Sequence, residues 1–216
     1  MKKEELINHL QEFSKVRSLF HSEADFQLEF GLFLFTLGYK VRLEKGFTQI
    51  DIYQKIELDM ELNGNIAIEL KYKTAELTEI FDHESYLLRQ HGAANLGRFD
   101  AFNDARRVKS LVNSSETKIT KGFTIFLTND QSYWANDASK TMSTEFALID
   151  NRELKATESL NWQSESLNVN SVSKSRTGDY APIKIDFNDK IKWFDFSEIN
   201  KSKSGTFRFF VLDVNN

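Results

Sequence analysis

Ile66-Ala-Ile-Glu-Leu-Lys-Tyr-Lys73 is the stretch of this chain that decides the fold. Its apolar residues predict a buried strand, which a charged pair interrupts. Side chains two positions apart in a strand share a face, so Glu69 and Lys71 are expected to project side by side. Burying charge is unfavourable unless the groups are paired or bind a metal. The stretch therefore predicts a core strand whose polar pair has either a structural or a chemical role.

Turn and periodicity patterns surround this strand with further elements. Asn63-Gly64 predicts a hairpin turn to a preceding strand over residues 56–62. The helix expected over residues 22–37 is apolar around most of its circumference, which is typical of a buried helix. This order predicts an α/β fold with a mixed central sheet flanked by helices. The other patterns predict helices over residues 3–20, 83–91 and 98–112, and strands over residues 39–43, 48–53, 122–128, 191–199 and 206–214.

Composition limits the class of protein. The 216 residues, 40% of them hydrophobic, are enough for one domain with its own core. The chain has no Cys, which excludes disulfides and thiolate zinc sites. No stretch approaches the ~20 apolar residues of a membrane span, and the charged N-terminus shows no signal-peptide pattern. We therefore expect a soluble cytoplasmic protein without membrane contact. The net charge of −4 argues against a non-specific nucleic-acid coat protein but permits a local basic cleft.

Two acidic residues give the central strand its context. Glu23 follows Ser22, a good N-cap, at the start of the second expected helix. Asp51 stands between two isoleucines in Gln49-Ile-Asp-Ile-Tyr53. With Glu69-Leu-Lys71, these residues resemble the PD-(D/E)xK nuclease superfamily, whose members share the restriction-endonuclease-like fold. The resemblance covers roughly residues 20–130, and Ile50 stands where the superfamily's name has proline.

The resemblance implies metal-dependent hydrolysis of phosphodiester bonds in nucleic acid, with DNA the expected substrate. Mg²⁺ (or Mn²⁺) prefers hard oxygen ligands and keeps several waters. Asp51 and Glu69 are the expected ligands, and the backbone carbonyl of Leu70 is a third. Lys71 would orient the attacking water or stabilise developing charge. Glu23 is expected to face the sheet, where it would take a second metal or hold a metal-bound water.

Asp59 is an alternative to Asp51 as a metal ligand. It lies ten residues before Glu69, so a short turn would place it directly across the hairpin. Its neighbours Glu57 and Glu61 suggest a solvated face, and we therefore favour Asp51. The structural alternative for the whole group is a buried Glu69–Lys71 ion pair with unrelated surface acids.

Three further residues are candidates for substrate binding. Lys73 shares a strand face with Lys71 and would meet a phosphate. Gln90 and Arg98 lie near the helix that follows the motif, and in the superfamily this helix often lends a polar residue to the site. The alternative for Arg98 is a helix cap beside a glycine-bearing turn. Three charged residues of that helix lie off its apolar stripe and are expected on a solvated face: Asp104, Arg106 and Arg107.

We therefore expect a single domain over residues 1–216, with a nuclease core at about 20–130 and a C-terminal region, about 140–216, of unassigned role. The expected activity is that of a Mg²⁺-dependent nuclease. The alternative is a degenerate member of the fold that binds nucleic acid or protein without cutting it. The resemblance also implies a homodimer and a setting in restriction, defence or DNA repair.

Overall fold

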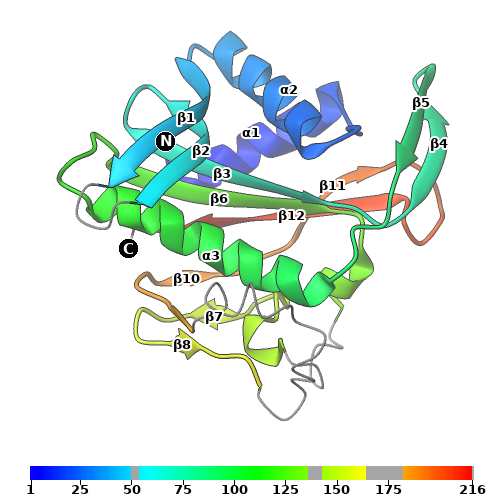
Figure 1. The fold of residues 1–216 in the computed structure, drawn as a ribbon. Helices are drawn as coiled ribbons and strands as arrows, with labels where there is room; N and C mark the ends of the chain where they lie inside the picture. Colours follow the sequence, from blue (N-terminus) through cyan, green and yellow to red (C-terminus); the bar gives the residue numbers. More distant parts are fainter. Residues whose placement is uncertain (50–53, 136–142, 164–181, 216) are drawn as a thin grey trace.

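The computed structural model of the protein describes residues 1–49, 54–135, 143–163 and 182–215. A six-stranded sheet of order β1-β2-β3-β6-β12-β11 forms its centre (Figure 1). β3 and β6 are parallel, whereas the other neighbours in this sheet are antiparallel. The expected mixed sheet is therefore confirmed. Its strands are β1 (Val41–Gln49), β2 (Gln54–Leu62), β3 (Ile66–Lys73), β6 (Lys121–Thr128), β11 (Phe194–Glu198) and β12 (Thr206–Asp213).

Helices cover both faces of this sheet, as expected. α1 (Lys3–Val16) and α2 (Glu23–Thr36) lie on one face, and α3 (Ala94–Asn113) lies on the other (Figure 1). Because β11 and β12 belong to the central sheet, the C-terminal part of the chain completes the core. No helix in the described ranges is long and apolar enough to cross a membrane. Short strands lie beyond α3: β7 (Glu153–Leu154), β8 (Ser159–Leu160), β9 (Ile183–Lys184) and β10 (Asp189–Lys190).

The β2–β3 hairpin fixes the position of the charged pair. Asn63 and Gly64 have φ of 54° and 80°, the left-handed values that a tight hairpin turn of this kind requires. Met60 pairs with Ile68 in the antiparallel register. Continuing this register by one residue sets Asp59 opposite Glu69. The predicted turn is thus confirmed, and it brings two acids together.

A second hairpin replaces the helix expected over residues 83–91, and that prediction is wrong. β4 (Leu77–Phe81) pairs with β5 (Glu84–Leu88) through a turn in which Asp82 and His83 have φ of 49° and 65°. Tyr86 and Leu88 are buried while the residue between them is exposed, the two-residue period of a strand. Tertiary packing of alternate side chains therefore outweighed the helical propensity of this segment. The hairpin projects from one end of the molecule (Figure 1).

Two further strand predictions need correction. Residues 39–43 and 48–53 were expected to form separate strands, but β1 is one continuous strand from Val41 to Gln49. The chain continues through Glu44, whose φ is 51°, so a local kink replaces the expected interruption. Residues 50–53, including Asp51, lie outside the described residues. The strand expected over residues 191–199 is shorter, because β11 begins at Phe194.

α2 is buried on one side only. Phe26, Phe30 and Leu34 are fully buried against the sheet. On the outer side, Leu28 is 49% exposed and Phe35 is 66% exposed. The expectation of a helix buried all round is therefore wrong, because no layer of the described chain covers its outer face. The homodimer stays a prediction.

Candidate active site

Glu69 and Lys71 lie next to each other on the sheet face that α3 covers. Glu69 is only 3% exposed, and Lys71 is half-buried. Their charged groups meet two side chains of α3, Asp104 and Arg107. The strand periodicity thus placed the pair correctly, and the structure supplies the partners that its burial requires.

Asp59 is the acid that the structure brings to Glu69. Its Oδ2 accepts a hydrogen bond of 2.6 Å from the backbone N–H of Leu70, and its carboxyl group is hydrogen-bonded to that of Glu69. The expectation of a solvated face around Asp59 holds for Glu57, which is exposed, but is wrong for Glu61, which is 2% exposed and forms an ion pair with Lys45. Asp59 therefore lies beside Glu69, where an acidic metal ligand was expected. Because Asp51 lies outside the described residues, its role as a ligand stays a prediction.

Glu23 reaches the same site from the first turn of α2. Its Oε2 accepts a hydrogen bond of 2.7 Å from the backbone N–H of Tyr72, and its Oε1 lies 4.0 Å from Nζ of Lys71. Burial raises the pKa of Glu23, while the charge of Lys71 opposes that rise. The prediction that Glu23 faces the sheet near the motif agrees with this placement.

Two residues of α3 complete the cluster. Oδ2 of Asp104 lies 3.2 Å from Nζ of Lys71, and its Oδ1 lies 3.2 Å from Nη1 of Arg107. Nη2 of Arg107 lies 3.1 Å from Oε1 of Glu69 and donates to the backbone carbonyl of Glu57. For Asp104 and Arg107, the prediction of a solvated face is wrong.

The sequence did contain a signal for Asp104. Ala101, Asp104, Ala105 and Val108 follow the helical spacing of one face, and all four are buried. An acid on a face that small residues otherwise occupy indicates a partner beneath the helix. Arg107 follows Asp104 by three positions, a spacing at which helical side chains meet.

The cluster has more acidic groups than basic ones. Among the described residues, the acids Asp59, Glu69, Asp104 and Glu23 form ion pairs or hydrogen bonds in a cluster with two bases, Lys71 and Arg107. Full ionisation of these six groups would leave an excess of two negative charges. Burial, together with the hydrogen bond and charge of Asp59, raises the pKa of Glu69 to about 10. Burial also raises the pKa of Asp59. In the metal-free protein, this pair therefore holds a proton at neutral pH.

A divalent cation fits the chemistry of this donor set. The groups are hard oxygen ligands, which suit Mg²⁺. Oε1 of Glu69 is buried and accepts no hydrogen bond, even though Arg107 is near. No three His, Cys, Asp or Glu side chains in the described ranges are already arranged around one point as a metal site. A cation held by Asp59 and Glu69 would displace the proton that this pair holds. The ligand role of the Leu70 carbonyl stays a prediction.

The structure does not bring Gln90 or Arg98 to this cluster. Arg98 is buried, and its guanidinium donates to the backbone carbonyl of Ser132 at 2.5 Å. Nε2 of Gln90 donates to Asp130 at 3.1 Å. The first turns of α3 pack against the short helix Gln131–Tyr133, where Gly97 and Arg98 lie beside the ring of Tyr133. Lys73 does remain near Glu23, whose pKa its charge lowers.

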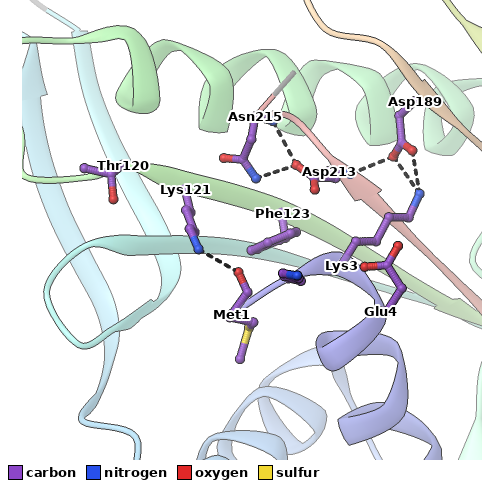
Figure 2. Close-up of a pocket in the computed structure, with 10 residues that line it drawn as sticks. Met1, Lys3, Glu4, Thr120, Lys121, Phe123, Asp189, Asp213 and Asn215 are labelled. Carbon is purple, nitrogen blue, oxygen red and sulfur yellow. Dashed lines mark hydrogen bonds and ion pairs between the residues drawn. The ribbon is translucent and has the colours of Figure 1, made fainter.

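A second polar cluster lies where the N-terminal segment meets the end of the chain (Figure 2). It lines a cavity of about 420 Å³. Nζ of Lys3 lies 2.7 Å from both carboxylate oxygens of Asp189, whose Oδ2 also accepts the backbone N–H of Asp213. Nζ of Lys121 donates to the carbonyl of Met1 at 3.0 Å. These groups satisfy one another, so the cluster has a structural role.

Comparisons of the chain with protein-family models, curated proteins and solved structures found no match. The function is therefore inferred from the geometry and electrostatics of the site.

Proposed function

We propose that this protein is a metal-dependent nuclease with a restriction-endonuclease-like fold, which hydrolyses phosphodiester bonds of nucleic acid, with DNA as the expected substrate. The observation that carries the proposal is the buried Asp59–Glu69 carboxyl pair beside Lys71, in a cluster with an excess of negative charge. A purely structural network would be expected to balance its buried charges.

The arrangement of elements supports the fold assignment. α2 precedes the antiparallel strands β1, β2 and β3, and α3 then crosses to β6, which is parallel to β3. The acids lie at the start of the helix and on the two central strands of this unit. Such a placement agrees with the resemblance seen in Glu23 and in Glu69-Leu-Lys71.

Asp59 and Glu69 would hold Mg²⁺ or Mn²⁺. When bound, the metal supplies positive charge at the phosphate and lowers the pKa of a coordinated water. Glu23 lies on the other side of Lys71 and would hold a water or a second cation. Asp104 and Arg107 do not need to touch substrate, because their contacts fix the positions of Lys71 and Glu69.

Lys71 would act as a cation and not as a base. Burial alone would lower its pKa, but the carboxylates of Asp104 and Glu23 reverse this effect and raise the pKa above its usual value. The ammonium therefore remains charged at neutral pH. A fixed positive charge at this position stabilises the negative charge that develops on the phosphate during hydrolysis.

The second candidate function is that of a degenerate member of the fold, which binds nucleic acid or protein without cutting it. One observation favours it: Arg107, Asp104 and Lys71 already link Glu69 to Glu23 in a continuous chain of ion pairs. Such a network can stabilise the fold with no metal.

The first test is a cleavage assay on supercoiled plasmid, linear duplex and single-stranded DNA and RNA, in Mg²⁺, Mn²⁺ or EDTA. We expect cleavage that needs metal and falls by about 10²–10³-fold in Lys71→Ala. Lys121→Ala, a matched lysine variant in the second cluster, should cut at the wild-type rate. Equal rates for both variants would assign the cleavage to a contaminant or to another site.

Calorimetry with Mg²⁺ and Mn²⁺ separates the two functions when no substrate is cut. Because binding must displace a proton, the affinity should rise by about tenfold per pH unit between pH 6 and 9. Metal binding without cleavage of any substrate would support the degenerate binding module. No metal binding at all would show that the cluster is structural and would refute the nuclease proposal.

A further inference from the structure

A cavity of about 430 Å³ opens beside the candidate active site. It lies between the N-terminal turn of α2, the end of β3 and the last residues of the β4–β5 hairpin. Glu23, Lys73, Thr74, Arg89 and His91 are among the residues that line it. The size is that of a pocket for a small ligand or for part of a larger one.

The charged groups of this pocket are mainly basic. The structure gives Lys73 and Arg89 no ion pair with any residue that it describes. Glu23 is the acid that lines the pocket, and its oxygens already contact Tyr72 N–H and Lys71. Two cations at the end of the central strand are therefore available for an anion from outside.

His91 is held in one orientation by Thr74. The backbone N–H of His91 donates to the carbonyl of Thr74 at 2.8 Å, and Nδ1 of His91 accepts the backbone N–H of Thr74 at 3.1 Å. A neutral imidazole whose Nδ1 is an acceptor carries its proton on Nε2. The ring thus has a free, fixed donor. Thr74 Oγ1 also donates to the carbonyl of Arg89, which fixes the backbone at this residue.

We propose that this pocket binds a phosphate group of the nucleic-acid substrate, next to the bond that is cut. Lys73 and Arg89 would neutralise the phosphate, and Nε2–H of His91 would donate to one of its oxygens. This assignment rests on the proposed function, because Glu23 borders both the pocket and the candidate active site. The phosphate is either an internal phosphodiester or a terminal phosphomonoester, and both present the same anionic oxygens.

The test measures binding of labelled single-stranded and duplex oligonucleotides in EDTA, with the Lys71→Ala protein, so that neither cleavage nor metal contributes. Lys73→Ala and Arg89→Ala should each weaken binding by about tenfold. Each should also reduce the salt slope, which is the slope of the logarithm of the affinity against the logarithm of the salt concentration, by about one. His91→Asn keeps an acceptor for Thr74 N–H but lacks the ring that places a donor at the Nε2 position, and should weaken binding by a few-fold. Arg106→Ala, an exposed arginine on α3, is the matched control and should bind as the parent does.

The ends of the oligonucleotides distinguish the two sources of phosphate. If the variants lose affinity only for strands with a 5′- or 3′-phosphate, the pocket binds a terminal phosphomonoester. If they lose affinity equally for all strands, the pocket binds an internal phosphodiester. Parent-like affinity and salt slope in the folded Lys73→Ala and Arg89→Ala proteins would overturn the inference, as would the absence of oligonucleotide binding by the parent. Binding with these effects but without cleavage by the wild type would refute only the nuclease proposal.

Discussion

The two polar clusters of this molecule are built from similar residues but differ in charge balance. In the cluster of Figure 2, Lys3 meets both oxygens of Asp189, and that carboxylate also accepts a backbone N–H. Around Glu69, the acids outnumber the bases among the described residues, and two buried carboxylate oxygens, Oε1 of Glu69 and Oδ2 of Asp104, accept no hydrogen bond. Short ion-pair distances occur in both clusters, so distance alone does not separate a structural site from a chemical one. The unmatched charge is the difference on which we base the proposal that the Glu69 cluster is a chemical site.

The largest effect should come from the acid opposite Glu69. Asp59→Asn removes a charged ligand from the proposed metal site. Because a bound metal stabilises the transition state by several kcal/mol, cleavage should fall by roughly 10³-fold. Asp51→Asn should leave the rate within about threefold of the wild type if Asp59 is the ligand. The measurement is the cleavage rate of both variants in Mg²⁺. The reverse pattern would return the ligand role to Asp51 and remove Asp59 from the site.

A smaller effect concerns stability and its pH dependence. The pKa of Glu69 is about 10 in the folded protein and near its usual 4.5 in the unfolded chain. Because the folded state holds this proton more tightly, the contribution of Glu69 to stability is greatest below pH 4.5 and falls as the pH rises towards 10. Glu69→Gln keeps a hydrogen-bond donor without the charge, so it should stabilise the metal-free protein at pH 8 by roughly 1–3 kcal/mol.

Urea unfolding of the metal-free protein between pH 5 and 9 measures this dependence. The slope of stability against pH should be flatter in Glu69→Gln than in the wild type. Glu76→Gln changes an exposed glutamate in the same way and should stay within about 0.5 kcal/mol of the wild type. A destabilised Glu69→Gln protein would mean that Arg107 requires an ionised Glu69, and the two clusters would then be alike.

The smallest effect should come from the balanced cluster. Lys3→Ala leaves Asp189 with its backbone donor but without its cation, so the free energy of unfolding should fall by about 1–2 kcal/mol. Cleavage per folded molecule should not change. Chemical denaturation and the plasmid assay together check this pair of outcomes, and a selective loss of activity would contradict the structural role of this cluster.

Local patterns in the sequence predicted the parts of the site that local geometry determines. The two-residue period placed Glu69 and Lys71 on one face, and Asn63-Gly64 predicted the hairpin beside them. The strong N-cap at Ser22 predicted the position of Glu23, since its hydroxyl accepts the N–H of Asp25. In each case, residues close in the chain determine the outcome.

The parts that failed depend on contacts between distant segments. The spacing within α3 marks Asp104 as buried but does not identify Lys71 as its partner, so a solvated face was expected for Asp104 and Arg107. Glu57 and Glu61 resemble each other in sequence, yet Glu61 is buried because β1 brings Lys45 to it. The turn at Asp82-His83 was missed because neither residue is glycine, although both adopt positive φ.

The short Asn63-Gly64 turn also has a consequence for the order in which the chain folds. Asp59 and Glu69 are ten residues apart, so closing the loop between them costs little chain entropy, and such local contacts form early. Pairing of β12 with β6 must wait for a much longer loop to close. The two acids therefore meet before the sheet is complete. A proton or a divalent cation that relieves their repulsion would speed this early step, and alkaline, metal-free conditions would slow it.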